Sequence, residues 1–250
     1  MSKIALITGA TSGIGLATAQ AFAAAGIDLI LCGRRVERLQ AIKEELSQKV
    51  QVHTLSFDVR EQPQVVEALG SLTDRWRDID ILVNSTGNAY GLAPLQEGDT
   101  ADWDAMIDGN VKGLLYVSKP VVQQMVRRQT GHIVNLSSVA GKLTYANGAV
   151  YCASKKAVEA ISEGMRLDLT QHGIKVTNIA PGAVETEFSL VRFKGDAERA
   201  KKVYEGFEPL KAKDIADAIL YAVMAPAHVT IADITIYAAA QAGPTTIFRK

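Results

Sequence analysis

The sequence predicts an α/β fold in which a doubly wound parallel sheet of about seven strands carries helices on both faces. Two observations predict this fold. Short runs rich in β-branched residues alternate with longer amphipathic segments along the whole chain, which is the pattern of repeated strand–helix–strand units. Several of the short runs are apolar at almost every position, as strands buried on both faces of a parallel sheet must be.

The predicted elements follow one another in regular alternation. The expected strands are residues 3–8, 27–32, 50–57, 78–84, 131–137, 174–180 and 229–237. The expected helices are residues 15–25, 36–46, 63–72, 101–125, 150–172 and 213–224. Gly26 ends the first helix, because glycine readily adopts the conformation that follows a helix C-terminus. Pro120 lies inside the fourth helix, where proline removes a hydrogen bond, so we expect a kink or a helix end there.

Length and composition indicate one domain with a small-molecule partner. The 250 residues show no composition shift, repeat or low-complexity tract, and one α/β domain of this size is ordinary. The 27 basic and 27 acidic residues balance, so no basic field favours nucleic acid or an anionic membrane. The four histidines and the two cysteines, Cys32 and Cys152, have no ligand or disulfide spacing, so we expect neither a bound metal nor a disulfide.

The ends and apolar runs of the chain predict a cytoplasmic protein. The apolar run near the N-terminus is ended by Thr8 and Gly9, which is too early for a secretory signal. No other run is apolar for long enough to cross a bilayer.

A glycine-rich loop follows the first predicted strand. It reads TGATSGIG from Thr8 to Gly15 and leads directly into the first helix. Glycines there allow a tight turn and a close backbone approach, and the helix N-terminus offers unpaired N–H groups to a pyrophosphate. This placement indicates a dinucleotide site of the Rossmann type. The expected cofactor-binding residues of this loop are Gly9, Thr11, Ser12, Gly13, Ile14 and Gly15.

Two arginines, Arg34 and Arg35, follow the second predicted strand. An enzyme that uses NAD typically has a carboxylate here, which binds the ribose hydroxyl groups. A guanidinium group suits a 2′-phosphate instead, whereas a carboxylate would repel it. The alternative is a solvated charge pair at a helix start, but cations are unfavourable at a helix N-terminus. The two arginines therefore favour NADP as the cofactor.

Polar and small residues follow the remaining strands. Asp58 and Val59 would meet the adenine, although Asp58 could instead cap the next helix. Asn84 and Gly87 belong to a turn that would let the backbone pass close to the cofactor ribose, and such a turn could also be a plain loop. After the sixth strand, the expected cofactor-binding residues are Pro181, Gly182 and Thr186.

Tyr151 and Lys155 lie four residues apart in a predicted helix. Positions with this spacing share one face of a helix about 6 Å apart along its axis, so both side chains can reach one ligand. An isolated pair of this kind is also compatible with a phenol packed on a lysine stem. The other motifs of the chain decide between these interpretations.

Taken together, these motifs resemble the short-chain dehydrogenase/reductase family over essentially the whole chain. The matching segments, in order, are TGATSGIG, NSTG, GNVKG, LSSVAG, YCASK and PGAVET. Ser85 and Thr86 depart from the family turn, which has asparagine and alanine there. The ending ITIYAAAQAG also departs from the VDGG segment of many family reductases, which argues against the acyl-carrier-protein reductases.

The resemblance implies a catalytic set of Asn110, Ser138, Tyr151 and Lys155. Tyr151 would exchange the proton of an alcohol or carbonyl substrate while hydride moves to or from the nicotinamide. A phenol has a pKa near 10, and Lys155 and the oxidised nicotinamide would lower it by two to three units. Ser138 would donate to the substrate oxygen, with Ser137 as the rival, and Asn110 would be linked to Lys155 through water.

The segments CGRRVERLQ, TEFSLVRFKGD and APAHV are similar to those of NADP-dependent 3-hydroxy acid dehydrogenases of the serine, allo-threonine and 3-hydroxypropionate type. This similarity implies a small hydroxy acid substrate. Residues 189–199 are polar and typical of a mobile lid, in which Arg192 would pair with a substrate carboxylate unless it is only a solvated surface arginine. The tentative substrate site is Ser138, Tyr151 and Arg192.

Two other functions are compatible with the sequence. One is an NADPH-dependent reductase of ketones, sugars or 3-oxoacyl thioesters. The other is a non-catalytic NADP-binding regulator, since a fold alone does not define an activity; the intact catalytic set argues against it. The apolar faces of the helices at 101–125 and 150–172, together with the habit of the family, imply a homotetramer.

Overall fold

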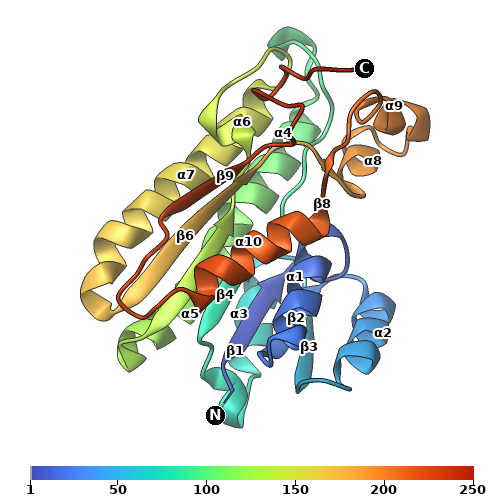
Figure 1. Cartoon of the computed structure of the whole chain (residues 1–250). Helices are drawn as coiled ribbons and strands as arrows, with labels where there is room; N and C mark the ends of the chain where they lie inside the picture. The colour runs from blue at the N-terminus through green and yellow to red at the C-terminus, as the bar shows by residue number, and fades with distance from the viewer. Residues whose placement is uncertain (1) are drawn as a thin grey trace.

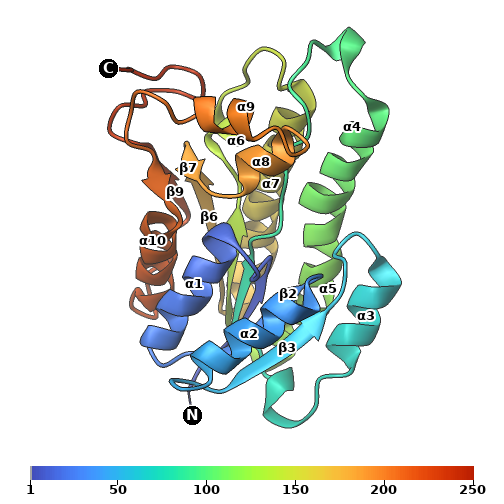
Figure 2. The ribbon, with the colours of Figure 1, turned by 90° about the vertical axis from the view of Figure 1, so that its right-hand side faces the viewer.

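The computed structural model describes residues 2–250 and contains one large parallel sheet between two layers of helices (Figures 1 and 2). The strand order is β3-β2-β1-β4-β5-β6-β9, and all neighbouring strands are parallel. The strands are β1 (Ile4–Thr8), β2 (Asp28–Gly33), β3 (Val52–Ser56), β4 (Ile81–Asn84), β5 (Gly131–Leu136), β6 (Ile174–Pro181) and β9 (Asp233–Ile236). The predicted fold class is confirmed.

The helices that cover the sheet are the predicted ones, and all of them except α2 have changed ends. One face carries α1 (Gly13–Ala24), α2 (Val36–Leu46) and α10 (Ala212–Met224). The other face carries α3 (Gln62–Gly70), α5 (Gly113–Arg128) and α7 (Ala149–Leu169). The short helix α6 (Val139–Lys142) follows β5.

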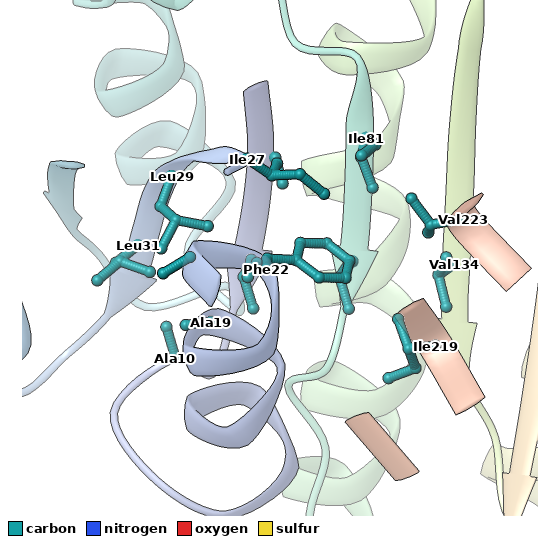
Figure 3. Close-up of a cluster of buried hydrophobic side chains, with 14 of the residues drawn as sticks. Ala10, Ala19, Phe22, Ile27, Leu29, Leu31, Ile81, Val134, Ile219 and Val223 are labelled. Atoms are coloured by element: carbon teal, nitrogen blue, oxygen red, sulfur yellow. The ribbon is translucent and has the colours of Figure 1, made fainter. Parts of the chain in front are cut away.

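Alternation along the strands divides the core into two layers. In β1, Ala5 and Ile7 face the α1 side, whereas Ile4 and Leu6 face the α5 side, and all four are buried. Phe22 of α1 is fully buried at the centre of the first layer, amid Ile81, Val134, Ile219 and Val223 (Figure 3). A side chain of this size fixes the position of α1 against the sheet, and with it the start of α1.

The long helix predicted at 101–125 is two helices with an irregular turn between them. α4 (Thr100–Ile107) leads into a wide π-helical turn at Asp108–Lys112, and α5 continues from Gly113. Pro120 does not end α5, which runs through it to Arg128. The irregularity therefore lies where Asn110 is, and π-helical turns are frequent at functional sites.

The last predicted strand is shorter than expected. β9 covers only Asp233–Ile236, rather than residues 229–237. Before it, the Ile231 carbonyl accepts a hydrogen bond from the Thr177 hydroxyl, and the Ala232 carbonyl accepts one from the Asn178 N–H. Side-chain and single backbone contacts thus replace the regular strand ladder in this segment.

A small lid covers the carboxyl ends of the central strands (Figure 2). The lid runs over residues 187–202 and contains α8 (Phe188–Arg192) and α9 (Ala197–Lys202). A two-stranded parallel pair, β7 (Val184–Glu185) with β8 (Leu210–Lys211), flanks it. Three short 3₁₀ turns complete the elements at Asp74–Arg77, Leu95–Glu97 and Thr170–His172. None of the helices in residues 2–250 combines the length and apolarity that a bilayer span requires.

Candidate active site

A cleft of about 680 Å³ opens at the carboxyl ends of the strands, beneath the lid. The order of the strands reverses between β1 and β4, and ligands of open α/β sheets bind at such a switch point. The cleft is lined by nineteen of the predicted site residues: Gly9, Thr11, Ser12, Gly13, Ile14, Gly15, Arg34, Arg35, Asp58, Val59, Gly87, Asn110, Ser138, Tyr151, Lys155, Pro181, Gly182, Thr186 and Arg192.

Asn84 is the predicted site residue that does not line the cleft. Its side chain is 3% exposed, and its amide nitrogen donates to Ser118 Oγ and Asn135 Oδ1, both at 2.9 Å. Because β4 still runs between its neighbours at this position, the side chain points into the layer beneath the sheet. The Asn84 side chain ties β4 to β5 and α5, and a contact between the backbone of this turn and the cofactor stays a prediction.

The glycine loop brings the backbone of β1 close to its neighbours. Gly9 has a φ of +65°, and a Cβ there would lie 3.2 Å from the Ser85 carbonyl oxygen. A Cβ on Gly15 would overlap the Gly9 carbonyl. The first turn of α1 contains no acidic residue, and Ser12 makes no side-chain cap to it. The open N–H groups and the absent Cβ atoms together fit a pyrophosphate at this helix start.

Arg35 lies across the glycine loop. Its guanidinium group donates to Thr11 Oγ1 at 3.1 and 2.8 Å and to Ser12 Oγ at 2.7 Å. It also forms an ion pair with Glu187 of the lid, at 3.0 Å. Arg35 thus joins the ends of β1 and β2 to the lid on the outer side of the cleft.

Arg34 and Asp58 face each other at the next strand ends. The Asp58 carboxylate accepts from Arg60 at 2.6 Å and from Arg34 at 3.4 Å. Burial works to raise the pKa of Asp58, but Arg60 and Arg34 hold it below its ordinary value. Asp58 is not the cap of α3, because Glu61 precedes that helix. Its carboxylate is already engaged by guanidinium groups.

Tyr151 and Lys155 lie on the buried face of α7, with Ser138 opposite at the end of β5. Tyr151 is 8% and Lys155 5% exposed. Ser138 Oγ accepts from the Ala140 N–H at 3.1 Å and lies close enough to the Tyr151 phenol to lower its pKa. Ser137 donates its hydroxyl to the Lys155 carbonyl oxygen at 3.1 Å. The rival serine is thus committed to the backbone of α7.

Burial dominates the pKa of Tyr151 in the protein without cofactor. In the protein without cofactor, burial raises the pKa of Tyr151 well above its ordinary value, and Ser138 and Arg192 oppose this only in part. Lys155 is not among the groups that oppose this rise, and its Nζ donates to the Leu136 carbonyl at 2.8 Å. Burial lowers the pKa of Lys155 itself to about 8. The predicted fall in the Tyr151 pKa includes the charge of the oxidised nicotinamide, so it stays a prediction for the cofactor-bound protein.

Asn110 is held by the irregular turn that precedes α5. Its side chain is 2% exposed, accepts from the Asn88 N–H, and donates to the Asn88 carbonyl and to Ser154 Oγ at 2.8 and 3.0 Å. A Cβ on Gly87 would lie 3.0 Å from Lys155 Nζ and 3.2 Å from Asn110 Oδ1. Gly87 therefore keeps open the space between the lysine and the asparagine.

Arg192, at the end of α8, reaches over the cleft to the catalytic candidates. Its guanidinium carbon lies 5.6 Å from the centre of the Tyr151 ring and 5.8 Å from that of Tyr145. Nε donates to the Gly91 carbonyl and Nη2 to the Tyr145 hydroxyl, both at 3.2 Å. Within residues 2–250, these partners are neutral groups. A positive charge without a carboxylate partner thus stands beside Tyr151.

Several cleft residues have no signal in the sequence. Gln241 is 6% exposed and accepts from the Ala183 N–H at 2.9 Å, which fixes the turn after β6. Tyr145 contacts Arg192, and Glu187 contacts Arg35 and Arg38. Gln241 could not be found from the sequence, because it lies about sixty residues from the turn it holds and belongs to no motif.

The fold and the cleft define a dinucleotide-binding α/β protein that has serine, tyrosine and lysine side chains gathered at its switch point. The chain belongs to the short-chain dehydrogenase family, which it matches over residues 3–196. In the described residues 2–250, no group of three or more histidine, cysteine, aspartate or glutamate side chains is arranged to hold a metal ion.

Several characterised relatives are similar over nearly the whole chain. The chain is 47% identical over 232 residues to sulfoacetaldehyde reductase 2 of Chromohalobacter salexigens, covering 92% of each protein. It is 47% identical over 229 residues to the NADP-dependent 3-hydroxy acid dehydrogenase YdfG of Salmonella typhi, covering 91% of this chain and 92% of the relative. The closed form of a serine dehydrogenase complexed with NADP+ superposes with a TM-score of 0.93 at 41% identity, covering 99% of each chain.

The depressed pKa of Lys155 predicts that this residue destabilises the cofactor-free protein. A fall from 10.5 to about 8 means that the native state disfavours the ammonium form, by about 3 kcal/mol. We expect Lys155→Met to raise the free energy of unfolding by about 2 kcal/mol at pH 7, after the loss of the bond to Leu136 is counted. Urea unfolding of both proteins without cofactor measures this difference in the free energy of unfolding.

The difference in unfolding free energy between Lys155→Met and the wild-type protein should depend on pH if the depressed Lys155 pKa is its cause. Below pH 8 the wild-type lysine is charged in both states, so the difference between the two proteins is constant. Between pH 8 and 10.5 the unfolded state binds one proton more than the native state, so the wild-type protein gains stability with rising pH and the difference shrinks. Lys156→Met, at the exposed neighbouring position, is the control. A destabilised Lys155→Met protein at pH 7 would contradict the expectation.

Proposed function

We propose that the protein is an NADP-dependent dehydrogenase that transfers hydride between the nicotinamide and a small hydroxy acid, namely a 3-hydroxy acid of the serine, allo-threonine or 3-hydroxypropionate type. The observation that carries the proposal is the position of Arg192, 5.6 Å from the Tyr151 ring. A cation beside the proton-transferring group selects a substrate whose reacting carbon lies near an anionic group. The whole chain would act as one NADP-binding domain.

The cleft supports NADP as the cofactor through its own residues. The glycine loop and the start of α1 would hold the pyrophosphate, and Arg34 and Arg35 would hold the 2′-phosphate. Gly87, Lys155, Pro181, Gly182 and Thr186 would surround the nicotinamide ribose and ring.

The residues around the substrate oxygen divide the proton chemistry among them. The bound nicotinamide supplies or accepts the hydride. The raised pKa of Tyr151 keeps its phenol protonated in the cofactor-free protein, which is the form that donates a proton to a carbonyl oxygen during reduction. Ser138 would donate a second hydrogen bond to that oxygen and stabilise its developing charge.

Lys155 and Asn110 lie behind the phenol, where they would help to move the proton that Tyr151 gives up or receives. Lys155 Nζ and Asn110 Oδ1 flank the open space at Gly87. A chain of hydrogen bonds through this space would connect the buried phenol with solvent. Since the Asn110 side chain forms its hydrogen bonds with Asn88 and Ser154, we assign Asn110 a positioning role.

The chemistry of the named relatives points to one feature of the substrate. In 3-oxo acids and in sulfoacetaldehyde alike, a single carbon separates the reacting carbonyl carbon from the central atom of the anionic group. Arg192 could pair with a carboxylate or a sulfonate, because a guanidinium group donates to both. We therefore propose a substrate with an anionic group at this spacing.

The two other functions carry less support. A reductase of neutral ketones or sugars would leave Arg192 without a purpose beside Tyr151. A non-catalytic NADP-binding regulator would need neither Ser138 nor Tyr151 at the switch point. We also propose that the protein works in the cytoplasm, where its two buried cysteines, Cys32 and Cys152, stay reduced.

Replacement of Tyr151 by phenylalanine tests the chemistry. The variant loses only a hydroxyl, so we expect it to bind NADPH as the wild-type protein does and to lose at least about 100-fold in kcat, the usual contribution of general acid–base catalysis. Oxidation of serine or 3-hydroxypropionate with NADP, followed at the nicotinamide absorbance, measures kcat, and NADPH fluorescence measures binding. Wild-type turnover by a correctly folded variant would refute the mechanism.

Arg192→Leu tests the proposed substrate class. We expect kcat/KM for 3-hydroxypropionate to fall by about 100-fold, through loss of a charge-assisted pair, while kcat/KM for a neutral secondary alcohol changes little. Arg199→Leu is the matched control, because Arg199 is also in the lid and stacks on Phe193, 4.4 Å from its ring centre. An equal loss for both substrates would reject the role of Arg192.

We further propose a homotetramer that forms through the helices α4, α5 and α7. Leu115 of α5 is 41% and Leu167 of α7 is 78% exposed in the single chain, so these helices present apolar side chains that another copy of the chain would bury. Light scattering should give a mass about four times the 26.8 kDa of the chain. A mass equal to that of one chain would contradict the tetramer.

A further inference from the structure

The side of the cleft next to α2 is closed by a carboxylate from the lid. Arg35 Nη1 lies 3.0 Å from one carboxylate oxygen of Glu187, and Arg38 Nη1 lies 2.9 Å from the other. Each oxygen of Glu187 thus accepts from a different guanidinium group. The three side chains are 42–49% exposed, so the contact can open without disturbing the core.

These two arginines have Glu187 as their ion-pair partner. The other carboxylate of this region, Asp58, is paired with Arg34 and Arg60 instead. Arg35 is also fixed by its bonds to Thr11 and Ser12, so its guanidinium group stays at the mouth of the glycine loop. An anion that enters at this point meets N–H donors that Glu187 already uses.

We propose that Glu187 is a built-in competitor for the 2′-phosphate of the coenzyme. In the free protein it holds Arg35, one of the two arginines proposed to bind this phosphate, together with the neighbouring Arg38, and it gives them up when NADP binds. This inference rests on the proposed use of NADP. A carboxylate and a phosphate monoester both accept from guanidinium groups in the same planar geometry. The phosphate carries more negative charge, so it can displace the carboxylate, but the displacement weakens the net binding.

Displacement of Glu187 would also loosen the lid, because the residues on either side of Glu187 connect the glycine loop with α8. Thr186, just before Glu187, lies against Gly13 of the glycine loop. A Cβ atom on Gly13 would lie 3.4 Å from Thr186 Cγ2. Directly after Glu187 begins α8, which ends at Arg192. Displacement of Glu187 therefore releases the lid at the end next to α2, while Lys194 still pairs with Asp102 at 2.9 Å at the other end. The competition would speed the release of the coenzyme.

The charge state of Glu187 agrees with this role. Hydrogen bonds from Arg35 and Arg38 hold the pKa of Glu187 below its ordinary value. The carboxylate is therefore ionised wherever the enzyme meets its coenzyme near neutral pH.

Binding of three nucleotides tests the proposal without any turnover. Titration calorimetry with NADP, NAD and 2′,5′-ADP would compare the wild-type protein with Glu187→Gln. Two exposed ion pairs are lost, so we expect the Kd of NADP and of 2′,5′-ADP to fall by about 3- to 10-fold. The Kd of NAD, which has no 2′-phosphate, should change by less than about 2-fold. Displacement of bound NADPH, followed by its fluorescence, should be slower by the same factor as the fall in Kd.

Glu185→Gln is the matched control. Glu185 lies two residues away and pairs with Lys211 outside the cleft, so its removal changes the net charge of the protein equally. We expect its nucleotide affinities to equal those of the wild-type protein. Glu187→Ala is the second variant and should shift the three dissociation constants in the same directions as Glu187→Gln.

Three results would overturn the inference while leaving the use of NADP intact. These are an unchanged or weaker affinity of Glu187→Gln for NADP, an equal gain for NADP and NAD, and the same gain in Glu185→Gln. A wild-type protein that binds NAD as tightly as NADP would instead refute the proposed coenzyme, and the inference with it. The wild-type titrations alone separate this last case from the others.

Discussion

The reversal of strand order between β1 and β4 is the constraint on which the rest of the structure depends. Chain segments that leave these two strands turn to opposite sides, and the sheet itself leaves a gap between them. Glycine keeps the gap open where backbones come close, at Gly9 and Gly15, and where Gly87 faces the side chains of Lys155 and Asn110. The functional groups discussed above reach this gap from the ends of strands, from α7, from the turn before α5 and from the lid.

Burial at the switch point sets the chemistry of the ionisable groups. The same low-dielectric surroundings raise the pKa of Tyr151 and lower that of Lys155, so both side chains favour their neutral forms more than they would in water. The protein holds this unfavourable pair in place through the packing of α7 against β5 and β6. The protein thus gives up stability by burying Tyr151 and Lys155 at the site where its function requires them.

The sequence predicts the parts of the site that repeat a local rule. The glycine loop, the arginines after β2 and the spacing of Tyr151 and Lys155 each depend on a few neighbouring residues, and the structure places all of them at the cleft. Asn84 does not line the cleft although β4 ends where the sequence predicts, because its side chain turns toward Ser118 and Asn135 inside the protein. The wide turn at Asn110, the contact between Gln241 and Ala183, and the pairing of Glu187 with Arg35 and Arg38 depend on tertiary contacts. No local pattern of the sequence could predict these three.

The contact between Gln241 and the turn after β6 has a practical consequence for work with this protein. Gln241 and the segment that follows it lie beside the cleft, whereas Ser2 and the start of β1 lie at the opposite end of the sheet (Figure 1). A purification tag, a fluorescent fusion or a surface linker attached after Lys250 would crowd the cleft. The same attachment before Ser2 would leave that region untouched, so immobilised or fused forms should be joined through the N-terminal side.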